Sequence, residues 1–321
     1  MASGGRGIAV VVPARDAQAS LGRAVRSALG EPLVTECVVV DDASADRTAS
    51  VAEGLASADP RVAIVRRSVR GGPAAARNAG LDAARADWVC FLDADDELVA
   101  GGLSALGDAL AATPGAVCAL GRFVAHTDAG EQADVGPWSH EQLSPVVRRG
   151  GRTIESPEGM TPEALVTRLV SPPPGAWLVD VEALRAVGGF DEGARRSEDV
   201  ELLVRLAFSG RIVCVQRDCL YYARHGAQRS QSHTARRWGR SLTLWLMLRS
   251  APGARATLRL ARGMRAYHLE LFERRASSPR PEVRVLRWRN LAAIAALWAA
   301  GSLAAVLPRR ALRPRPKRTV D

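Results

Sequence analysis

The sequence is poor in several features that mark particular classes of protein. It has one lysine, Lys317, and five cysteines with no Cys-x-x-Cys motif. An odd number of irregularly spaced cysteines does not favour a disulfide framework or a zinc knuckle, and it fits a reduced cytoplasmic setting. The first apolar run, residues 8–12, is too short for the core of a signal peptide. We therefore expect the folded body of the chain to stay in the cytoplasm.

The surplus of positive charge is placed unevenly along the 321 residues. Residues 1–232 contain 24 basic and 30 acidic residues, whereas residues 233–321 contain 20 basic and 4 acidic ones. A basic tail on an acidic body predicts a polyanionic partner, which is either nucleic acid or the anionic inner face of a membrane. Part of the basicity reflects heavy use of arginine throughout, although composition alone would not make one part acidic and the other basic.

The tail also contains apolar segments. Residues 236–249 and 255–275 are typical of basic helices with one apolar face. Residues 291–307 form an uncharged run that is at the short limit for a bilayer span, so it either spans the membrane or lies at its surface. Trp288 and Trp298 favour a bilayer over a nucleic-acid groove. We expect a basic helical extension over 233–321 that associates with an anionic membrane surface and binds no nucleic acid.

The body, residues 1–232, alternates β-branched runs with alanine-rich stretches of helical length. We expect strands at 8–12, 37–40, 62–65 and 88–92, separated by helices at 19–29, 47–56 and 74–84. This alternation predicts a Rossmann-like, mostly parallel sheet flanked by helices, with Asp46 as a helix cap. Residues 121–174 lack periodicity and predict an irregular segment. Ordered structure is expected again at 177–187, at a helix over 199–208 and at a strand over 212–215.

Acidic residues follow two of the predicted strands. In such sheets ligands bind where the parallel strands end. Asp93 and Asp95, with Asp96 directly behind, follow strand 88–92, and paired carboxylates there suit Mg²⁺ or Mn²⁺ holding a diphosphate. The plain alternative is a strand end capped by solvated acids. Asp41 and Asp42 follow strand 37–40, where they either accept hydrogen bonds from a base or ribose or cap the next helix.

A third candidate segment opens the helix at 74–84. Gly71 and Gly72 permit close approach of the backbone, and Pro73 suits a first helical turn. Arg77 lies on the first turns of this helix, followed by Asn78, and an arginine there can pair with phosphate oxygens.

These motifs occur together in one order: VVDDAS at 39–44, GPAAARNAGL at 72–81 and FLDADD at 91–96. In register, they resemble the nucleotide-sugar-binding half of the family 2 glycosyltransferases, which have the GT-A fold. A weaker resemblance continues through GGFDE at 188–192, SEDVE at 197–201 and YYARH at 221–225. Together the matches cover about two-thirds of the chain and divide the body into a nucleotide-sugar half at 1–98 and an acceptor half at 99–232.

The resemblance implies a role for each matched residue. Asp199 would be the catalytic base, with Glu198 as the second candidate, and Asp95 would bind Mn²⁺ or Mg²⁺, with His225 approaching the metal or the diphosphate. The plain alternatives are a helix cap for the Glu-Asp pair and simple solvent exposure for His225. The implied donor-binding residues are Pro13, Ala14, Arg15, Asp41, Asp42, Arg77, Asp93 and Ala94. The implied acceptor-side residues are Trp177, Gly189, Phe190 and Asp191.

One departure from the family pattern affects the donor. Arg15 and Asp16 follow the first strand's proline where the family commonly has an aromatic residue and an asparagine. Recognition of the base therefore stays open between UDP, GDP and dTDP donors.

The resemblance predicts an inverting, metal-dependent transfer of a sugar to a hydroxyl of a lipid-linked or surface-polysaccharide acceptor at the inner face of the cytoplasmic membrane. Two other classes remain open: a nucleotidyltransferase that makes nucleotide-sugars, and a non-catalytic membrane scaffold on the same fold. The first would carry a glycine-rich basic loop near strand 8–12, which this sequence lacks. The second is opposed by the complete set of acids.

Overall fold

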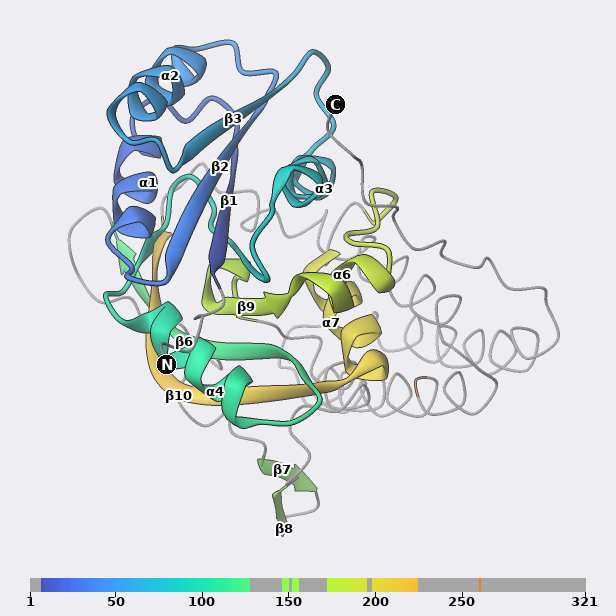
Figure 1. Ribbon diagram of the computed structural model, residues 1–321. Coiled ribbons are helices and arrows are strands. Elements are labelled where there is room, and N and C mark those ends of the chain that lie inside the picture. Colours follow the sequence, from blue (N-terminus) through green and yellow to red (C-terminus); the bar gives the residue numbers. More distant parts are fainter. Residues whose placement is uncertain are drawn as a thin grey trace, which may run out of the picture.

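The computed structural model describes residues 7–127, 146–149, 152–155, 172–194, 198–224 and 260. Within these residues, eight strands form one sheet in the order β3-β2-β1-β4-β9-β6-β10-β5, and β7 (Val146–Arg149) pairs with β8 (Arg152–Glu155) in a separate ribbon (Figure 1). The chain therefore has the mixed α/β architecture that its sequence pattern predicts.

The first half of the sheet consists of parallel strands joined by helical crossovers. β1 pairs in parallel with β2 on one side and with β4 on the other, and β2 pairs in parallel with β3. The strands are β1 (Ile8–Ala14), β2 (Val34–Asp42), β3 (Val62–Arg67) and β4 (Trp88–Phe91), and the helices are α1 (Leu21–Leu29), α2 (Thr48–Ala58) and α3 (Pro73–Ala83). All seven predicted elements are confirmed, with ends that differ by at most three residues.

The second half of the sheet mixes strand directions. β9 (Trp177–Asp180) is antiparallel to both of its neighbours, β4 and β6 (Ala116–Thr127). β6 runs parallel to β10 (Arg211–Arg224), and the short β5 (Glu97–Leu98) is antiparallel to β10. The helices of this half are α4 (Gly102–Ala112), α6 (Val181–Ala186) and α7 (Glu198–Ser209), and a short 3₁₀ turn spans Pro174–Ala176.

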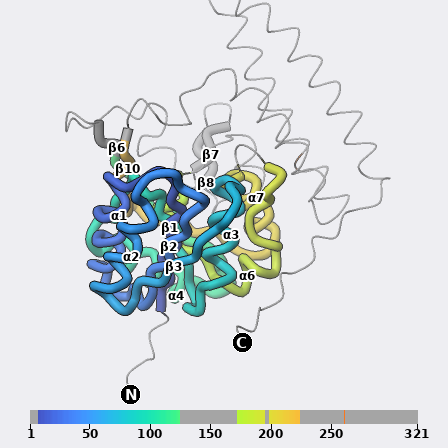
Figure 2. Tube along the Cα trace, turned by 90° about the horizontal axis from the view of Figure 1, so that it is seen from above, coloured from blue at the N-terminus to red at the C-terminus, as the bar shows by residue number. Residues whose placement is uncertain are grey.

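Both faces of the central strands are buried under helices, which explains why β1 is apolar without interruption. Val10 and Val12 pack in one cluster with residues of α1 and α4, whereas Ala9 and Val11 pack in a second cluster with residues of α3, α6 and α7. In Figure 2, α1 and α2 lie on one side of β1 to β3 and α3 lies on the other. Parallel sheets are buried in this way, with helices on both faces.

Gly80 lets α3 lie close against the sheet. A Cβ atom on Gly80 would stand 2.2 Å from Val11 Cγ1 and 3.1 Å from Val40 Cγ2. The helix could not keep this position with any larger residue, because side-chain contacts at 2.2 Å do not occur. This close packing fixes Arg77 and Asn78, which lie one turn earlier on α3, relative to the ends of β1 and β2.

Three predicted boundaries were wrong. Residues 121–174 were expected to be irregular, but β6 continues to Thr127, and β7 and β8 also lie in this range. β10 is far longer than the predicted strand 212–215. Its full length was not predicted because its pairing with β6 shifts register on both sides of Asp218, which breaks the alternation of apolar and polar residues. Asp46 precedes the cap position, yet its carboxylate still accepts a hydrogen bond from Thr48 N at 2.9 Å.

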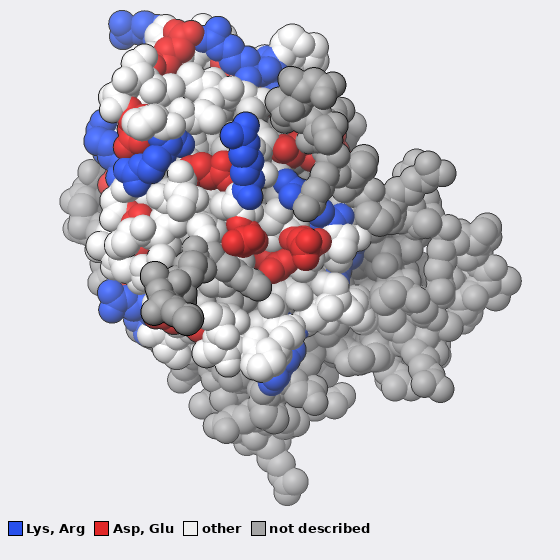
Figure 3. Space-filling model, in the orientation of Figure 1, with Lys and Arg blue, Asp and Glu red and all other residues white. Residues whose placement is uncertain are grey.

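Much of the tail lies outside the described residues, and so do His225, the predicted helix 236–249 and the apolar run 291–307. Leu260, within the predicted helix 255–275, is described and packs fully buried in the cluster that contains α3 and α7. In the described part of the chain, no helix is both long and apolar enough to cross a membrane. On the face shown in Figure 3, acidic and basic side chains of the body are interspersed.

Candidate active site

The carboxyl ends of β1, β2 and β4 meet at one edge of the sheet. Ala14 is in register with Asp41, and Leu92 N donates to Val11 O at 3.0 Å, directly before the acids at 93–96. The aspartates that follow β2 and β4 therefore flank the end of β1. Because ligands of such sheets bind at this edge, the acids are concentrated where the sequence predicts the donor site.

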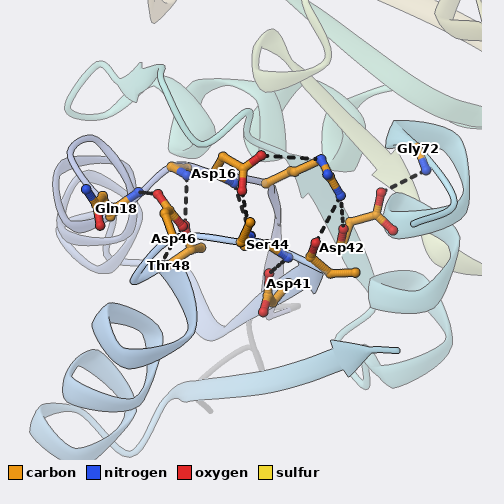
Figure 4. Close-up of polar contacts among 12 residues, drawn as sticks. Asp16, Gln18, Asp41, Asp42, Ser44, Asp46, Thr48 and Gly72 are labelled. Atoms are coloured by element: carbon orange, nitrogen blue, oxygen red, sulfur yellow. Dashed lines mark hydrogen bonds and ion pairs between the residues drawn. The ribbon is translucent and has the colours of Figure 1, made fainter. Parts of the chain in front are cut away.

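Two loops at this edge are joined by hydrogen bonds (Figure 4). The loop after β1 donates from Asp16 N to Ser44 Oγ at 3.0 Å and from Gln18 N to Asp46 Oδ2 at 3.1 Å, and Asp16 Oδ1 accepts from Ala45 N at 2.7 Å. Asp16 and Ala43 have positive φ values of 49° and 57°. Non-glycine residues adopt this conformation at a cost, so the joined loops hold a specific backbone shape.

Arg15 is part of this junction. Its Nη1 donates to Asp42 O at 2.9 Å and to Ala43 O at 3.0 Å, and its Nε lies 3.5 Å from Asp16 Oδ2. The guanidinium group therefore stands across the loop after β2, at the place where an aromatic residue was expected. The two residues before Arg15 have no polar side chain: Pro13 is partly exposed and Ala14 is buried.

The two neighbouring aspartates of β2 have different partners. Asp41 Oδ1 accepts from Ser44 N at 3.0 Å. Asp42 is buried, accepts from Gly71 N and Gly72 N at 2.8 Å each, and lies 3.0 Å from Arg67 Nε. The carboxylate of Asp42 thus holds the loop before α3, including Gly72 at φ +86°. The sequence predicts donor binding for both aspartates, and that role stays a prediction for each.

Arg77 connects the acids after β4 with α7. The buried guanidinium donates from Nη2 to Asp93 Oδ1 at 2.7 Å and from Nη1 to Glu198 Oε1 at 3.3 Å, and it stands 5.3 Å from the ring centroid of Phe190. Burial alone would lower the pKa of Arg77, but the charges of Asp93 and Glu198 raise it. A phosphate role was predicted for Arg77, whereas its observed partners are two carboxylates that lie 105 positions apart in the sequence.

The Glu-Asp pair begins α7. Glu198, Asp199 and Glu201 all lie in the first turn of this helix, where the positive end of the helix dipole stabilises carboxylates. Burial raises the pKa of Glu198, and the charge of Arg77 opposes that rise. Both candidate base residues are therefore placed beside Arg77, and through Arg77 next to Asp93.

The acids after β4 differ sharply in exposure. Asp93 and Asp95 are partly exposed, whereas Asp96 is 1% exposed and its Oδ1 accepts from Ala223 N at 2.9 Å. Burial raises the pKa of Asp96 well above its usual range, and the charges of Asp93 and Asp95 raise it further. Within the described residues, no group of three or more His, Cys, Asp or Glu side chains is arranged to hold a metal ion. Ala94 is buried between the two exposed aspartates.

Three residues to which the sequence assigned no individual role, Asn78, Glu201 and Arg205, hold the GGFDE loop. Asn78 Nδ2 donates to Phe190 O and to Glu192 Oε1 at 2.9 Å each, and Asn78 Oδ1 accepts from Phe190 N at 2.9 Å. Arg205 donates to Gly189 O at 2.8 Å and pairs with the fully buried Glu201. The signal was present in the sequence, because Glu201 and Arg205 stand four apart on a predicted helix, the spacing of an ion pair.

The predicted acceptor-side residues separate into two groups. Trp177 is fully buried and donates from Nε1 to Pro172 O at 2.9 Å. Phe190 is also buried and packs edge-on against Phe91, 5.0 Å between ring centroids. Both rings lie in the core, and their place on the acceptor side stays a prediction. Asp191 is partly exposed and follows Phe190, and Gly189 before them has a φ of +68°.

The fold, with acids at the ends of its parallel strands and a Glu-Asp pair on the helix that faces them, defines a domain of the GT-A type. Residues 9–151 match the model for glycosyl transferase family 2. These residues, somewhat under half of the chain, are similar to the glycosyltransferases of that family. The chain spans between 25% and 36% of the length of the first curated relatives that it matches.

Particular relatives and neighbours agree with this assignment. Over 101 residues, the chain is 38% identical to the GalNAc(5)-diNAcBac-PP-undecaprenol beta-1,3-glucosyltransferase of Campylobacter jejuni, a match that covers 31% of this chain and 33% of that protein. The structure of S. aureus TarS 1-349 with UDP-GlcNAc matches with a TM-score of 0.63 and 16% identity over 94% of this chain and 90% of that one. The Pyrobaculum calidifontis mannosyltransferase PcManGT with GDP-Man and Mn²⁺ matches with a TM-score of 0.53 and 17% identity, over 95% and 88%. At these identities the two structures establish the fold alone.

Proposed function

We propose that this protein is an inverting glycosyltransferase that moves a sugar from a nucleoside diphosphate to an acceptor hydroxyl. The observation that carries the proposal is the Arg77 bridge, in which one buried cation joins Asp93 at the donor edge to Glu198 beside Asp199. In a direct displacement, the diphosphate and the base that activates the acceptor lie on opposite sides of the same sugar ring. The donor site and the base must therefore be separated by no more than about the width of one sugar. The bridge places the two groups of carboxylates side by side.

In the proposed reaction, Asp199 takes the proton from the acceptor hydroxyl while the hydroxyl oxygen attacks the anomeric carbon. The new bond forms on the face opposite the diphosphate, and the bond between the anomeric carbon and the phosphate oxygen breaks with its electron pair leaving on the diphosphate. Glu198 already accepts a hydrogen bond from Arg77, so its role is to hold the start of α7. The configuration at the anomeric carbon is inverted.

A divalent cation fits the residues at the donor edge. Asp93 and Asp95 offer hard oxygen donors that are partly exposed, and Mg²⁺ or Mn²⁺ is commonly held by one or two carboxylates together with substrate phosphates and water. Asp95 would be the principal protein ligand, since Asp93 also pairs with Arg77. When bound, such an ion supplies neutralisation of the charge that develops on the leaving diphosphate. The Mn²⁺ in the PcManGT structure supports this assignment.

For the donor, the joined loops after β1 and β2 supply the candidate base site. The Asp41 carboxylate accepts hydrogen bonds, and the guanidinium of Arg15 donates them. Uracil, thymine and guanine each carry a ring N–H beside a carbonyl oxygen, and this pattern complements one acceptor and one donor. The proposed donors are therefore sugars of UDP, dTDP or GDP, in keeping with the UDP-GlcNAc and GDP-Man held by the two structural neighbours.

The first experiment is a thermal-shift screen of the protein with UDP, GDP, dTDP, CMP and ATP, each with Mn²⁺ and with EDTA. A ligand that binds the native state raises the melting temperature, by an amount that grows with its concentration over Kd. We expect a metal-dependent rise with one nucleoside diphosphate, lost in Asp95→Ala and retained in the control Asp108→Ala on α4. A rise with ATP alone would favour a nucleotidyltransferase, and no rise with any nucleotide would favour a non-catalytic scaffold.

We also propose that residues 233–321 bring the enzyme to an anionic membrane that carries a lipid-linked or polysaccharide acceptor. The support is the charge of the tail, 20 basic against 4 acidic residues, and the undecaprenol-linked substrate named for the Campylobacter relative. Each arginine near such a surface contributes about 1 kcal/mol, less at high salt. The full chain is expected to sediment with vesicles of phosphatidylglycerol. It is expected to be released by 0.5 M salt, because the Debye length is then only about 4 Å and the attraction is screened. Equal sedimentation with phosphatidylcholine vesicles would contradict the electrostatic part of this proposal.

A further inference from the structure

The third acid of the motif at 93–96 is separated from the first two by its environment. Asp96 is 1% exposed, whereas Asp93 and Asp95 are partly exposed at the sheet edge. A side chain this deeply buried presents no surface to a donor or to an ion held at that edge. Asp96 therefore has a role different from ligand binding, although it belongs to the same four-residue motif.

The contacts of Asp96 run to β10, the strand beside the edge strand β5. Its Oδ1 accepts from Ala223 N at 2.9 Å, and its own N–H donates to Asp93 O at 3.0 Å, which closes the turn that carries Asp95. One residue thus holds the turn by its backbone and holds β10 by its side chain. Asp95 therefore lies in a turn that is closed by the hydrogen bond from Asp96 N to Asp93 O and is attached to β10 by the Asp96 carboxylate.

The side chain continues a ladder that the backbone begins. β5 is only two residues long and pairs Leu98 with Leu220 and Glu97 with Tyr221, and Val99 N donates to Cys219 O at 3.0 Å. Beyond Tyr221 on this edge, the carboxylate of Asp96 takes the place of a strand carbonyl as the acceptor for Ala223 N. The acid motif is therefore attached to β10 over successive residues.

We propose that Asp96 is a positioning residue that anchors the turn at 93–96 to the end of β10 and thereby sets the affinity for the metal-bound donor. The inference rests on the proposed function, because it concerns how Asp95 is presented to the donor. Without this hydrogen bond the turn would sample other orientations of Asp95. The apparent Kd of the donor would then rise, because only a fraction of the molecules would hold Asp95 in the binding orientation.

The test compares three variants of the full chain. Asp96→Asn keeps the Oδ1 acceptor and the shape, Asp96→Leu removes the acceptor on a larger side chain with the same branching, and Glu97→Gln is the control because its surface pair with Arg23 does not involve Ala223. The probe is the nucleoside diphosphate selected by the thermal-shift screen, titrated by calorimetry at several Mn²⁺ concentrations. Hydrogen exchange at the peptide containing Ala223 reports the anchor itself.

We expect Asp96→Leu to raise both the donor Kd and the Mn²⁺ concentration for half-maximal binding at least tenfold, with faster exchange at Ala223. Asp96→Asn and Glu97→Gln are expected to stay within about twofold of the parent. Faster exchange in Asp96→Leu with an unchanged donor Kd would overturn the proposal while leaving the proposed function intact. If Asp96→Leu does not fold, Asp96→Ser, which is too short to reach Ala223, replaces it under the same criteria. Absence of donor binding by the parent chain would instead contradict the proposed function.

Discussion

Asp199→Asn is expected to lower the rate of sugar transfer by about 10²- to 10⁴-fold, the range by which a positioned general base contributes. Asparagine keeps the size of the side chain and its place in the first turn of α7, but it cannot take the proton from the acceptor hydroxyl. Donor affinity is expected to stay unchanged, because the proposed donor contacts lie at the ends of the strands and not on α7. Single-turnover rates and calorimetric donor binding would measure the two effects separately.

Glu198→Gln is the matched comparison for this prediction, since the two acids are adjacent on α7. Loss of the Glu198 charge weakens the bridge to Arg77, so we expect lower thermal stability and a smaller loss of transfer than in Asp199→Asn. A larger loss of transfer in Glu198→Gln, with near-normal turnover in Asp199→Asn, would move the base to Glu198.

Arg77→Met is expected to lower the free energy of unfolding by about 3 kcal/mol and to abolish most transfer activity. Methionine fills a similar volume but leaves Asp93 and Glu198 without their shared cation, and breaking a buried ion pair by removing one partner is strongly destabilising. The charge of Arg77 favours the ionised form of Glu198, so its loss raises the pKa of that carboxyl. An NMR titration of the Glu198 carboxyl is then expected to have its midpoint at a higher pH in Arg77→Met than in the parent.

Denaturant unfolding and the NMR titration of Glu198 would test both parts of this prediction. Arg77→Lys is the control, because lysine keeps the charge without the forked geometry that reaches two carboxylates, so an intermediate loss is expected. Unchanged stability and an unchanged Glu198 titration in Arg77→Met would show that Asp93 and Glu198 do not depend on the bridge.

The bridge, together with Asn78, explains how the two halves of the domain are joined. Arg77 and Asn78 are consecutive on α3, and they contact different parts of the second half: Arg77 reaches α7, and Asn78 holds the backbone of Phe190 on both sides. The Glu201 and Arg205 pair secures the same loop from the other direction. Two adjacent side chains of the donor half therefore set the position of the proposed base and of the GGFDE loop.

Local pattern in the sequence was sufficient for the parallel half of the sheet. Apolar runs of β-branched residues and alanine-rich helices have clear periods, and the crossovers between parallel strands leave few alternative arrangements. The placement of Asp41, Asp93 and Asp95 at one edge followed from that topology alone. The second half was predicted less well, because β10 shifts register around Asp218 and β5 is only two residues long. Neither feature leaves a periodic signal.

By itself the sequence determined the α/β class, the acids at the ends of β2 and β4, and the Glu-Asp pair on α7. Only the tertiary structure decided which of these acids are exposed and which are paired. Asp41 and Asp42 are identical neighbours in the sequence and both are buried, yet they have different backbone partners. Asp95 and Asp96 are also neighbours, yet one is partly exposed and the other is buried against β10. The physical reason is that the energy of a carboxylate depends on the water and the donors around it, and these come from residues distant in the chain.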